Sequence, residues 1–333
     1  MTIVQAIVLG IVQGLTEFIP ISSTAHLIFA SRATGLYEGV EQTLRAERTT
    51  ATIAIIQLGT LLAVFVYFAR DILQITVAFV RDHLALLSGR SASGETVAAS
   101  ASGASSSGTT GQGFWSRLSP DARLGWLVIL GSIPVGVVGL LLKKQIEGTF
   151  TKNLWVIATM MIAIALLLLL AELVGKRTRG MEELGVRDAL AVGGAQVLAL
   201  IPGASRSGST IMGGLFAGET RETAARFSFL LSIPAIAASG LLELKEAYTK
   251  LPPETLLPLV VATIVSGVVG YASIWFLLRF LRTHTTGVFI VYRLVVGIVL
   301  LALLAGNFIK PLDASTHAPA TQTTSTRAAL ESF

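Results

Sequence analysis

The stretch LIPGASRSGSTIMGGLFA, residues 200–217, places one arginine among four hydroxyl side chains and four glycines. The segments on either side of it are apolar enough to lie at the depth of a membrane. An unpaired guanidinium is costly at that depth, so an arginine in such a segment indicates a functional site. Because guanidinium and hydroxyl groups bind anions, we predict an anion site inside a membrane protein.

A second polar interruption, QGLTEFIPISSTAH, occupies residues 13–26. In each half a glutamine, Gln13 or Gln196, precedes an Ile-Pro pair and a short polar run that contains serine. The two polar runs are Ser22-Ser23-Thr24 and Ser205-Arg206-Ser207. Interrupted apolar segments at corresponding positions of two halves point to a binding site. We predict an inverted repeat with halves at about 1–87 and 186–310; chance similarity between apolar segments is the alternative.

The composition excludes several classes of protein. Of the 333 residues, 53% are hydrophobic and 14% are charged, with a mean hydropathy of +0.73. Soluble domains carry about 25% charged residues, so this is an integral membrane protein. The net charge of +5 does not indicate nucleic acid, because the basic residues lie mostly at the ends of apolar runs. The absence of cysteine excludes a disulfide framework, a zinc–thiolate site and a cysteine nucleophile.

Six apolar runs have the roughly 20 residues that a membrane-spanning helix needs. We predict spanning helices at about 50–70, 122–143, 153–175, 222–246, 256–282 and 287–309. Shorter apolar pieces flank the two polar stretches, at 3–18 with 24–33 and at 188–201 with 207–217. Irregular backbone at membrane depth is tolerated only inside protein or beside a cavity, so these pieces predict two re-entrant helix–loop–helix hairpins. The expected fold is an all-α integral membrane protein.

We expect one polytopic membrane domain over residues 1–310. The Ser-, Gly-, Ala- and Thr-rich segment 88–113 predicts a disordered loop, and residues 313–333 predict a disordered tail. The basic amphipathic piece Arg70–Leu87 predicts a short extra helix or a segment along the membrane surface. Six spans put both termini on one side, and the arginines of the opposite loops favour the outer side for the termini.

The first stretch combines residues that suit catalysis. Gln13 and Glu17 share a helix face because they are four residues apart. Pro20 ends that helix, and the hydroxyl residues after it suit the start of the next helix, whose free amides attract an anion. Ser23 and His26 share a face of this second helix, which suits a nucleophile with an acid/base partner, while Glu17 suits a divalent cation. The alternative is a hydrogen-bonded helix break with a satisfied histidine.

The second stretch combines residues that suit phosphate binding. Gly203 and Gly208 let the backbone approach a ligand closely, and Arg206 offers a planar fork for phosphate. Further donors come from neighbouring hydroxyl groups on Ser205, Ser207, Ser209 and Thr210. The alternative is close packing through small residues with a snorkelling Arg206.

Charged residues elsewhere are expected to be structural. Glu222 and Arg226 are four residues apart, so we expect them to pair with each other. Arg293 lies inside the last apolar span, where we expect it to snorkel toward the membrane surface, a second anion contact being the alternative.

In their order and spacing, these residues resemble the two motifs of the undecaprenyl-diphosphate phosphatase family, the bacitracin-resistance proteins. The matching residues are Gln13, Glu17, Pro20, Ser22-Ser23-Thr24 and His26, then Pro202-Gly203, Ser205-Arg206-Ser207-Gly208 and Thr210. The resemblance covers roughly 1–87 and 114–310. It implies hydrolysis of undecaprenyl diphosphate to undecaprenyl phosphate, the lipid carrier for peptidoglycan, with Mg²⁺ or Ca²⁺. It also implies an active site that opens to the outer side of the bacterial inner membrane.

The same resemblance assigns roles to individual residues. Glu17 matches the second acid of a metal-binding motif, and Gln13 matches the first, where a glutamine cannot bind metal as a carboxylate does. Ser23 and His26 match the residues between which the nucleophile is debated, so either Ser23 attacks with His26 as base or His26 attacks directly. The set expected to bind the diphosphate is Gly203, Ser205, Arg206, Ser207 and Thr210.

Two other classes of function stay open at this point. A lipid-phosphate transporter or flippase also combines an inverted repeat with a midplane anion site, and phosphate release in detergent without a gradient separates it from a phosphatase. In a structural membrane protein without a site, burial of Glu17, His26 and Arg206 would cost desolvation free energy that no binding or catalysis offsets. The expected partners are the lipid substrate and membrane lipids, without nucleic acid; self-association into a homo-oligomer is left open.

Overall fold

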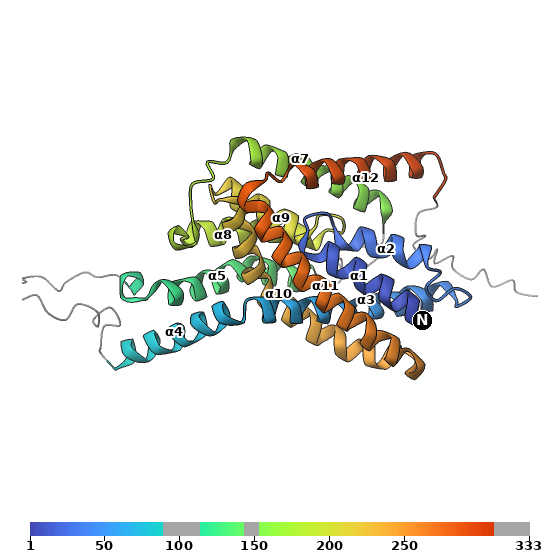
Figure 1. Ribbon diagram of the computed structural model, residues 1–333, viewed down its shortest axis with the longest axis horizontal. Coiled ribbons are helices and arrows are strands. Elements are labelled where there is room, and N and C mark those ends of the chain that lie inside the picture. The colour runs from blue at the N-terminus through green and yellow to red at the C-terminus, as the bar shows by residue number, and fades with distance from the viewer. Residues whose placement is uncertain (89–113, 143–152, 310–333) are drawn as a thin grey trace, which may run out of the picture.

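The computed structural model of the protein describes residues 1–88, 114–142 and 153–309, and the long elements within these ranges are all helical (Figure 1). The α-helices are α1 (Ile3–Phe18), α2 (Ser23–Ala33), α3 (Gln42–Tyr67), α4 (Ala69–Leu87), α5 (Pro120–Leu141), α7 (Leu154–Val174), α8 (Val186–Val197), α9 (Arg206–Phe216), α10 (Arg221–Lys250), α11 (Leu256–Thr283) and α12 (Gly287–Ala305). The expected disordered loop (88–113, apart from Ser88) and tail (313–333) lie outside the described residues.

Five of the six predicted spanning helices are present as candidate membrane spans. By length and composition, α5, α7, α11, α12 and the Glu47–Tyr67 part of α3 can cross a membrane. The helix predicted at 222–246 exists as α10, but in the described part of the chain it is not among these candidates. The crossing by α10 therefore remains a prediction.

Each polar stretch forms a helix–break–helix unit, α1 with α2 and α8 with α9. A proline lies in each break, and a serine in the left-handed region precedes the second helix, with φ 76° at Ser22 and φ 70° at Ser205. The long helices α3, α4, α5 and α7 separate the two units along the chain. The inverted repeat, with halves at about 1–87 and 186–310, and the insertion of the units into a membrane stay predictions.

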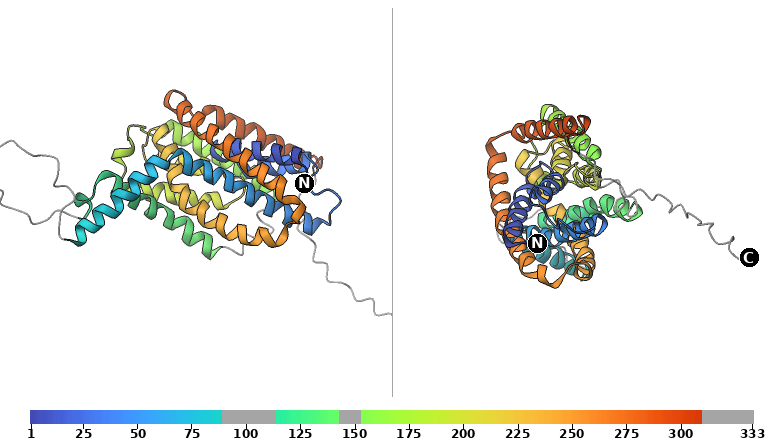
Figure 2. Two further views of the ribbon diagram at one scale, coloured as in Figure 1. Left: turned by 60° about the horizontal axis from the view of Figure 1, so that its bottom comes forward. Right: turned by 90° about the vertical axis from the view of Figure 1, so that its right-hand side faces the viewer.

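Helices far apart in the sequence pack side by side in the bundle. α11 packs along α1 and α3, and α12 packs along α7 (Figure 2). A Cβ atom at Gly59 would lie 2.1 Å from the Thr263 carbonyl oxygen, so glycine is required where α3 meets α11. Beside the first break, Phe18 and Phe229 meet edge-on with ring centroids 5.4 Å apart. This packing fixes the end of α1, which carries the first polar motif.

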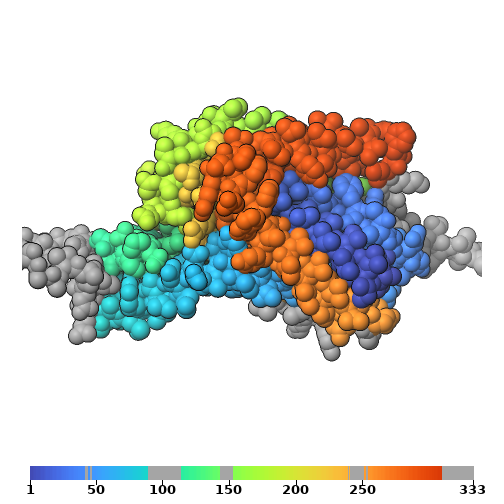
Figure 3. Space-filling model, viewed as in Figure 1, coloured from blue at the N-terminus to red at the C-terminus, as the bar shows by residue number. Residues whose placement is uncertain are grey.

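Large apolar side chains also cover the outer surface of α11 and α12. Figure 3 shows these helices, in orange and red, along one face of the molecule. The exposed residues include Val260, Ile264, Val268, Trp275 and Phe276 on α11 and Val288, Val291, Val295 and Ile298 on α12. Contiguous apolar patches of this kind mark contact with lipid or protein rather than with water. They agree with a multi-pass membrane protein.

The amphipathic segment after α3 forms α4, which confirms the extra helix predicted for Arg70–Leu87. α4 packs against α5, and both extend beyond the other helices at one end of the molecule (Figure 1). The N-terminus and the last turn of α12 lie at the other end (Figure 1). Both described ends of the chain thus lie at the same end of the bundle, as an even number of crossings requires.

Candidate active site

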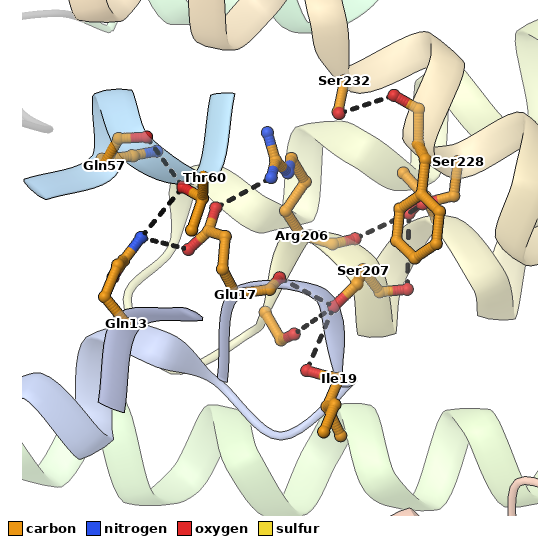
Figure 4. Close-up of polar contacts among 12 residues, drawn as sticks. Gln13, Glu17, Ile19, Gln57, Thr60, Arg206, Ser207, Ser228 and Ser232 are labelled. Atoms are coloured by element: carbon orange, nitrogen blue, oxygen red, sulfur yellow. Dashed lines mark hydrogen bonds and ion pairs between the residues drawn. The ribbon is translucent and has the colours of Figure 1, made fainter. Parts of the chain in front are cut away.

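The two breaks meet, and their charged residues form an ion pair. Glu17 at the end of α1 and Arg206 at the start of α9 are joined by a 2.8 Å contact between Oε1 and Nη2. Only 8% of the Glu17 side chain and 17% of the Arg206 side chain are exposed. Figure 4 shows Gln13, Glu17 and Arg206 pointing toward one another from three directions. The predicted anion-binding and acidic residues are therefore brought together.

The second carboxylate oxygen of Glu17 belongs to a small amide network. Gln13 donates from Nε2 to Glu17 Oε2 at 3.1 Å and to Thr60 Oγ1 at 3.4 Å. Its other amide atom, Oε1, is buried and has no hydrogen-bond partner among the described residues. Glu17 and Gln13 thus share a face of α1, as predicted. Oε1 of Gln13, which has no partner among the described residues, lies beside the Glu17 carboxylate.

The hydroxyl groups of the second motif mostly stabilise the break itself. Ser205 caps α9 by accepting from the Gly208 amide at 3.2 Å, and its hydroxyl lies 3.2 Å from Ser207 Oγ. Ser207 in turn donates to the Ile19 carbonyl oxygen at 3.4 Å, across to the first unit. Thr210 is buried and donates to the Arg206 carbonyl oxygen at 2.8 Å. These contacts fix Arg206; direct contacts of the hydroxyl groups with substrate stay predictions.

Gly203 has a packing role that its sequence context did not indicate. Its φ is +89°, and a Cβ atom there would lie 2.3 Å from the Ile157 carbonyl oxygen of α7. A side chain at this position would therefore displace the second break from α7.

Ser23 and His26 lie on α2, but no hydrogen bond joins them in the described structure. His26 Nδ1 lies 2.7 Å from the Ser22 carbonyl oxygen, and Nε2 lies 2.6 Å from the hydroxyl of Tyr292 on α12. Ser23, half-buried at the first position of α2, makes no hydrogen bond through its side chain to a described residue. The predicted nucleophile and base therefore share a helix without direct contact.

Arg293 is fully buried, so the expectation that it snorkels is wrong. Its guanidinium donates to the carbonyl oxygens of Pro20 (3.2 Å), Gly203 (3.0 Å) and Ala204 (3.0 Å), and Nε donates to Met161 (3.2 Å). It pairs with no carboxylate in the described part of the chain. This residue ties both breaks to α12 and leaves a fixed positive charge between them.

The expected pairing of Glu222 with Arg226 is also wrong. Arg226 contacts Asp71 of α4 at 2.5 Å, and Glu222 contacts Arg282 of α11 at 2.8 Å. Tertiary neighbours take precedence over the partner four residues along the helix, because each of these bonds joins two packed elements. These ion pairs lie outside the site.

The electrostatics of the site favour an anion. Two guanidinium groups and the N-terminal amides of α2 and α9 oppose a single carboxylate, Glu17. No group of three histidine, aspartate or glutamate side chains that could hold a metal occurs among the described residues. A divalent cation would therefore need oxygen ligands from a bound anion as well as from the protein.

Comparison with known proteins supports this chemistry. A family model described as "Bacitracin resistance protein BacA" matches residues 6–299. A protein of Syntrophobacter fumaroxidans is 48% identical over 89% of this chain and 95% of its own length. Proteins of Chloroherpeton thalassium and Prosthecochloris aestuarii are 45% and 43% identical, each over 92% of this chain and 98% and 99% of their own lengths. All three are named undecaprenyl-diphosphatase.

Proposed function

Because the chain belongs to the bacitracin resistance protein BacA family, we propose that it removes the terminal phosphate of undecaprenyl diphosphate. The product is undecaprenyl phosphate, the lipid carrier of cell-wall synthesis. The chain is thus a hydrolase, an undecaprenyl-diphosphatase, and its family membership connects it to bacitracin resistance.

The observation that carries this proposal is the contact between Glu17 and Arg206 at the meeting point of the two breaks. Arg206 uses one nitrogen for Glu17, and its remaining N–H groups suit the oxygens of a diphosphate. Arg293 and the amides at the starts of α2 and α9 add positive potential without adding a competing carboxylate. Phosphoryl transfer depends largely on such positioning and charge stabilisation.

Ser23 and His26 are the reacting groups of the proposed mechanism. Ser23 occupies the first position of α2, where the helix amides point toward an incoming phosphate. It attacks the terminal phosphorus, and His26 accepts its proton and later returns it. Direct attack by His26 is the competing version, which trapping of a phosphohistidine would establish.

A divalent cation, Mg²⁺ or Ca²⁺, belongs to the proposal, with Glu17 and Gln13 as its protein ligands. The orphaned Oε1 of Gln13 beside the Glu17 carboxylate fits an oxygen-binding cation. Mg²⁺ is commonly held by one or two carboxylates together with substrate phosphates, which suits a site with one carboxylate. When bound, the cation would neutralise charge on the diphosphate.

We further propose that the protein lies in the bacterial inner membrane with six spans, two re-entrant hairpins and the active site open to the outer side. Five helices with the length and composition of spans support a multi-pass protein. Surrounding lipids and the isoprenoid tail of the substrate would contact the exposed apolar faces of α11 and α12.

The test measures phosphate release from undecaprenyl diphosphate by purified protein in detergent, with and without a metal chelator. We expect release without any ion gradient, and loss of release when the chelator is present. Lipid movement across vesicles without phosphate release would instead support the transporter class. Release that persists in chelator would remove the cation from the proposal but keep the phosphatase.

A further inference from the structure

Both ring nitrogens of His26 have partners, and their chemistry defines the protonation of the ring. Nδ1 lies 2.7 Å from the Ser22 carbonyl oxygen, which can only accept a hydrogen bond. Nδ1 therefore carries the proton of the neutral ring, and Nε2 has the free lone pair. The Tyr292 hydroxyl, 2.6 Å from Nε2, is then the donor to that lone pair.

Tyr292 is itself held in a fixed position. Its ring lies nearly parallel to the His26 ring, with centroids 5.6 Å apart and an interplanar angle of 15°. The next residue, Arg293, is fully buried and donates to the carbonyl oxygens of Pro20 and Gly203, one in each break. The backbone that carries Tyr292 is therefore anchored to the same two breaks that form the site.

We propose that Tyr292 is the positioning residue of His26: its hydroxyl, with the Ser22 carbonyl oxygen on the other side of the ring, holds the Nδ1-protonated ring in place and directs Nε2 as the reacting nitrogen. This inference rests on the proposed phosphatase function and deepens it. No motif of the sequence analysis includes Tyr292, because a tyrosine inside an apolar span has no local pattern that indicates a site.

In the proposed step, the Ser23 oxygen forms a bond to the terminal phosphorus and its proton moves to Nε2. The lipid phosphate leaves with the electron pair of the broken bridging bond. Nε2 has one lone pair, so the Tyr292 hydroxyl must release this nitrogen before Nε2 takes the Ser23 proton or attacks phosphorus; once Nε2 is protonated, the hydroxyl can accept from it.

The first test compares Tyr292→Phe with Tyr271→Phe in the full-length protein. Tyr271 of α11 is 45% exposed and its ring contacts Tyr67, so it controls for loss of a tyrosine hydroxyl outside the site. We expect Tyr292→Phe to lower kcat at least about tenfold with KM within about twofold, and Tyr271→Phe to change neither. A kcat within about twofold of wild type, or a loss confined to KM, would overturn the inference.

Two further measurements separate positioning from a merely structural role. In a His26→Gln background, adding Tyr292→Phe should cause no further loss, because Tyr292 acts through His26; a second full loss would contradict this. Nitrogen-15 NMR of the imidazoles should show the Nδ1-protonated form of His26 in wild type, and the loss of the Tyr292 hydrogen bond in Tyr292→Phe should shift the Nε2 resonance. An unchanged spectrum would also overturn the inference. If wild-type protein releases no phosphate, the proposed function fails, whereas the NMR result still decides the role of Tyr292.

Discussion

At the scale of single residues, Arg206 has the most demanding geometry. Among contacts of the described residues, its side chain engages Glu17 through Nη2 alone, which leaves other N–H groups for a phosphate. A lysine has a point charge instead of a planar fork and loses its proton more easily in a desolvated site. Arg206→Lys should therefore cost about 2 kcal/mol of transition-state stabilisation, roughly 30-fold in kcat/KM.

Arg206→Ala should cost more while the protein stays folded, because it removes a ligand contact rather than core packing. Arg187→Lys is the matched control, since Arg187 is exposed at the start of α8. Kinetics beside thermal unfolding measure these effects. Near-wild-type turnover in Arg206→Lys, or unfolding of Arg206→Ala, would assign this arginine to the scaffold.

Gln13→Glu tests whether Gln13 faces the cation. A second carboxylate beside Glu17 would bind a cation between the two groups and would repel Glu17 when no cation is present. The variant should therefore bind Mg²⁺ more tightly and need less of it for half-maximal activity. Gln74→Glu, on the exposed face of α4, controls for the added charge. Superimposable metal titrations of wild type and Gln13→Glu would show that Gln13 does not contact the metal.

Glu219 predicts a pH dependence of stability. It is buried in the turn before α10, and neither carboxylate oxygen has a hydrogen-bond partner among the described residues. Burial, and secondly the charge of Asp188, raise its pKa from 4.5 to about 8, against the opposing effect of Arg179. Between these values the folded state holds a proton that the unfolded chain has lost. Stability therefore falls as pH rises through this window and levels off above it.

Glu219→Gln should remove this contribution, because an amide does not titrate. Thermal unfolding of both proteins from about pH 5 to about pH 9 measures it, and wild type should lose stability more steeply than the variant. Identical pH profiles would mean that the folded protein accommodates the charged carboxylate.

At the scale of elements, the two breaks share a backbone conformation but use their serines differently. Ser205 caps α9 through the Gly208 amide, whereas Ser22 makes no capping bond and its buried hydroxyl has no described partner. Glycine adopts the left-handed conformation without strain, so both Ser22→Gly and Ser205→Gly relieve strain. Only Ser205→Gly also loses a cap. In thermal unfolding, the Ser22→Gly variant should therefore have a higher unfolding temperature than the Ser205→Gly variant. The reverse order would contradict this account.

Local chemistry explains which elements the sequence could predict. A proline followed within three residues by serine favours the end of one helix and the start of the next, so both breaks were predictable. Their similarity predicted one binding site built from both, and in that site Glu17 and Arg206, 189 residues apart, are in contact. The contacts of Tyr292 and Arg293 depend on how α12 packs, which no local pattern encodes. The same holds for Arg226, whose partner Asp71 lies on α4 rather than on its own helix.

At the scale of the whole molecule, charge is unequal at the two ends of the bundle. The end opposite the N-terminus carries a group of arginines at helix ends and loops: Arg177, Arg179, Arg221, Arg226 and Arg282. Arginine-rich loops stay on the cytoplasmic side of a membrane. This distribution predicts that the N-terminal end, from which α1 leads to the first break, faces outward.

Cysteine labelling tests this orientation and the crossing of α10 together. The chain has no cysteine, so Glu38→Cys, Arg187→Cys and Glu254→Cys each give one reactive thiol at an exposed position. Glu38 precedes α3, Arg187 lies at the start of α8, and Glu254 follows α10. An impermeant reagent should label Glu38→Cys and Glu254→Cys in intact cells, but Arg187→Cys only after permeabilisation. The opposite pattern for all three would reverse the orientation. Labelling of Arg187→Cys and Glu254→Cys from one side would mean that α10 does not cross, since only α10 and the hairpin of α8 and α9 separate them.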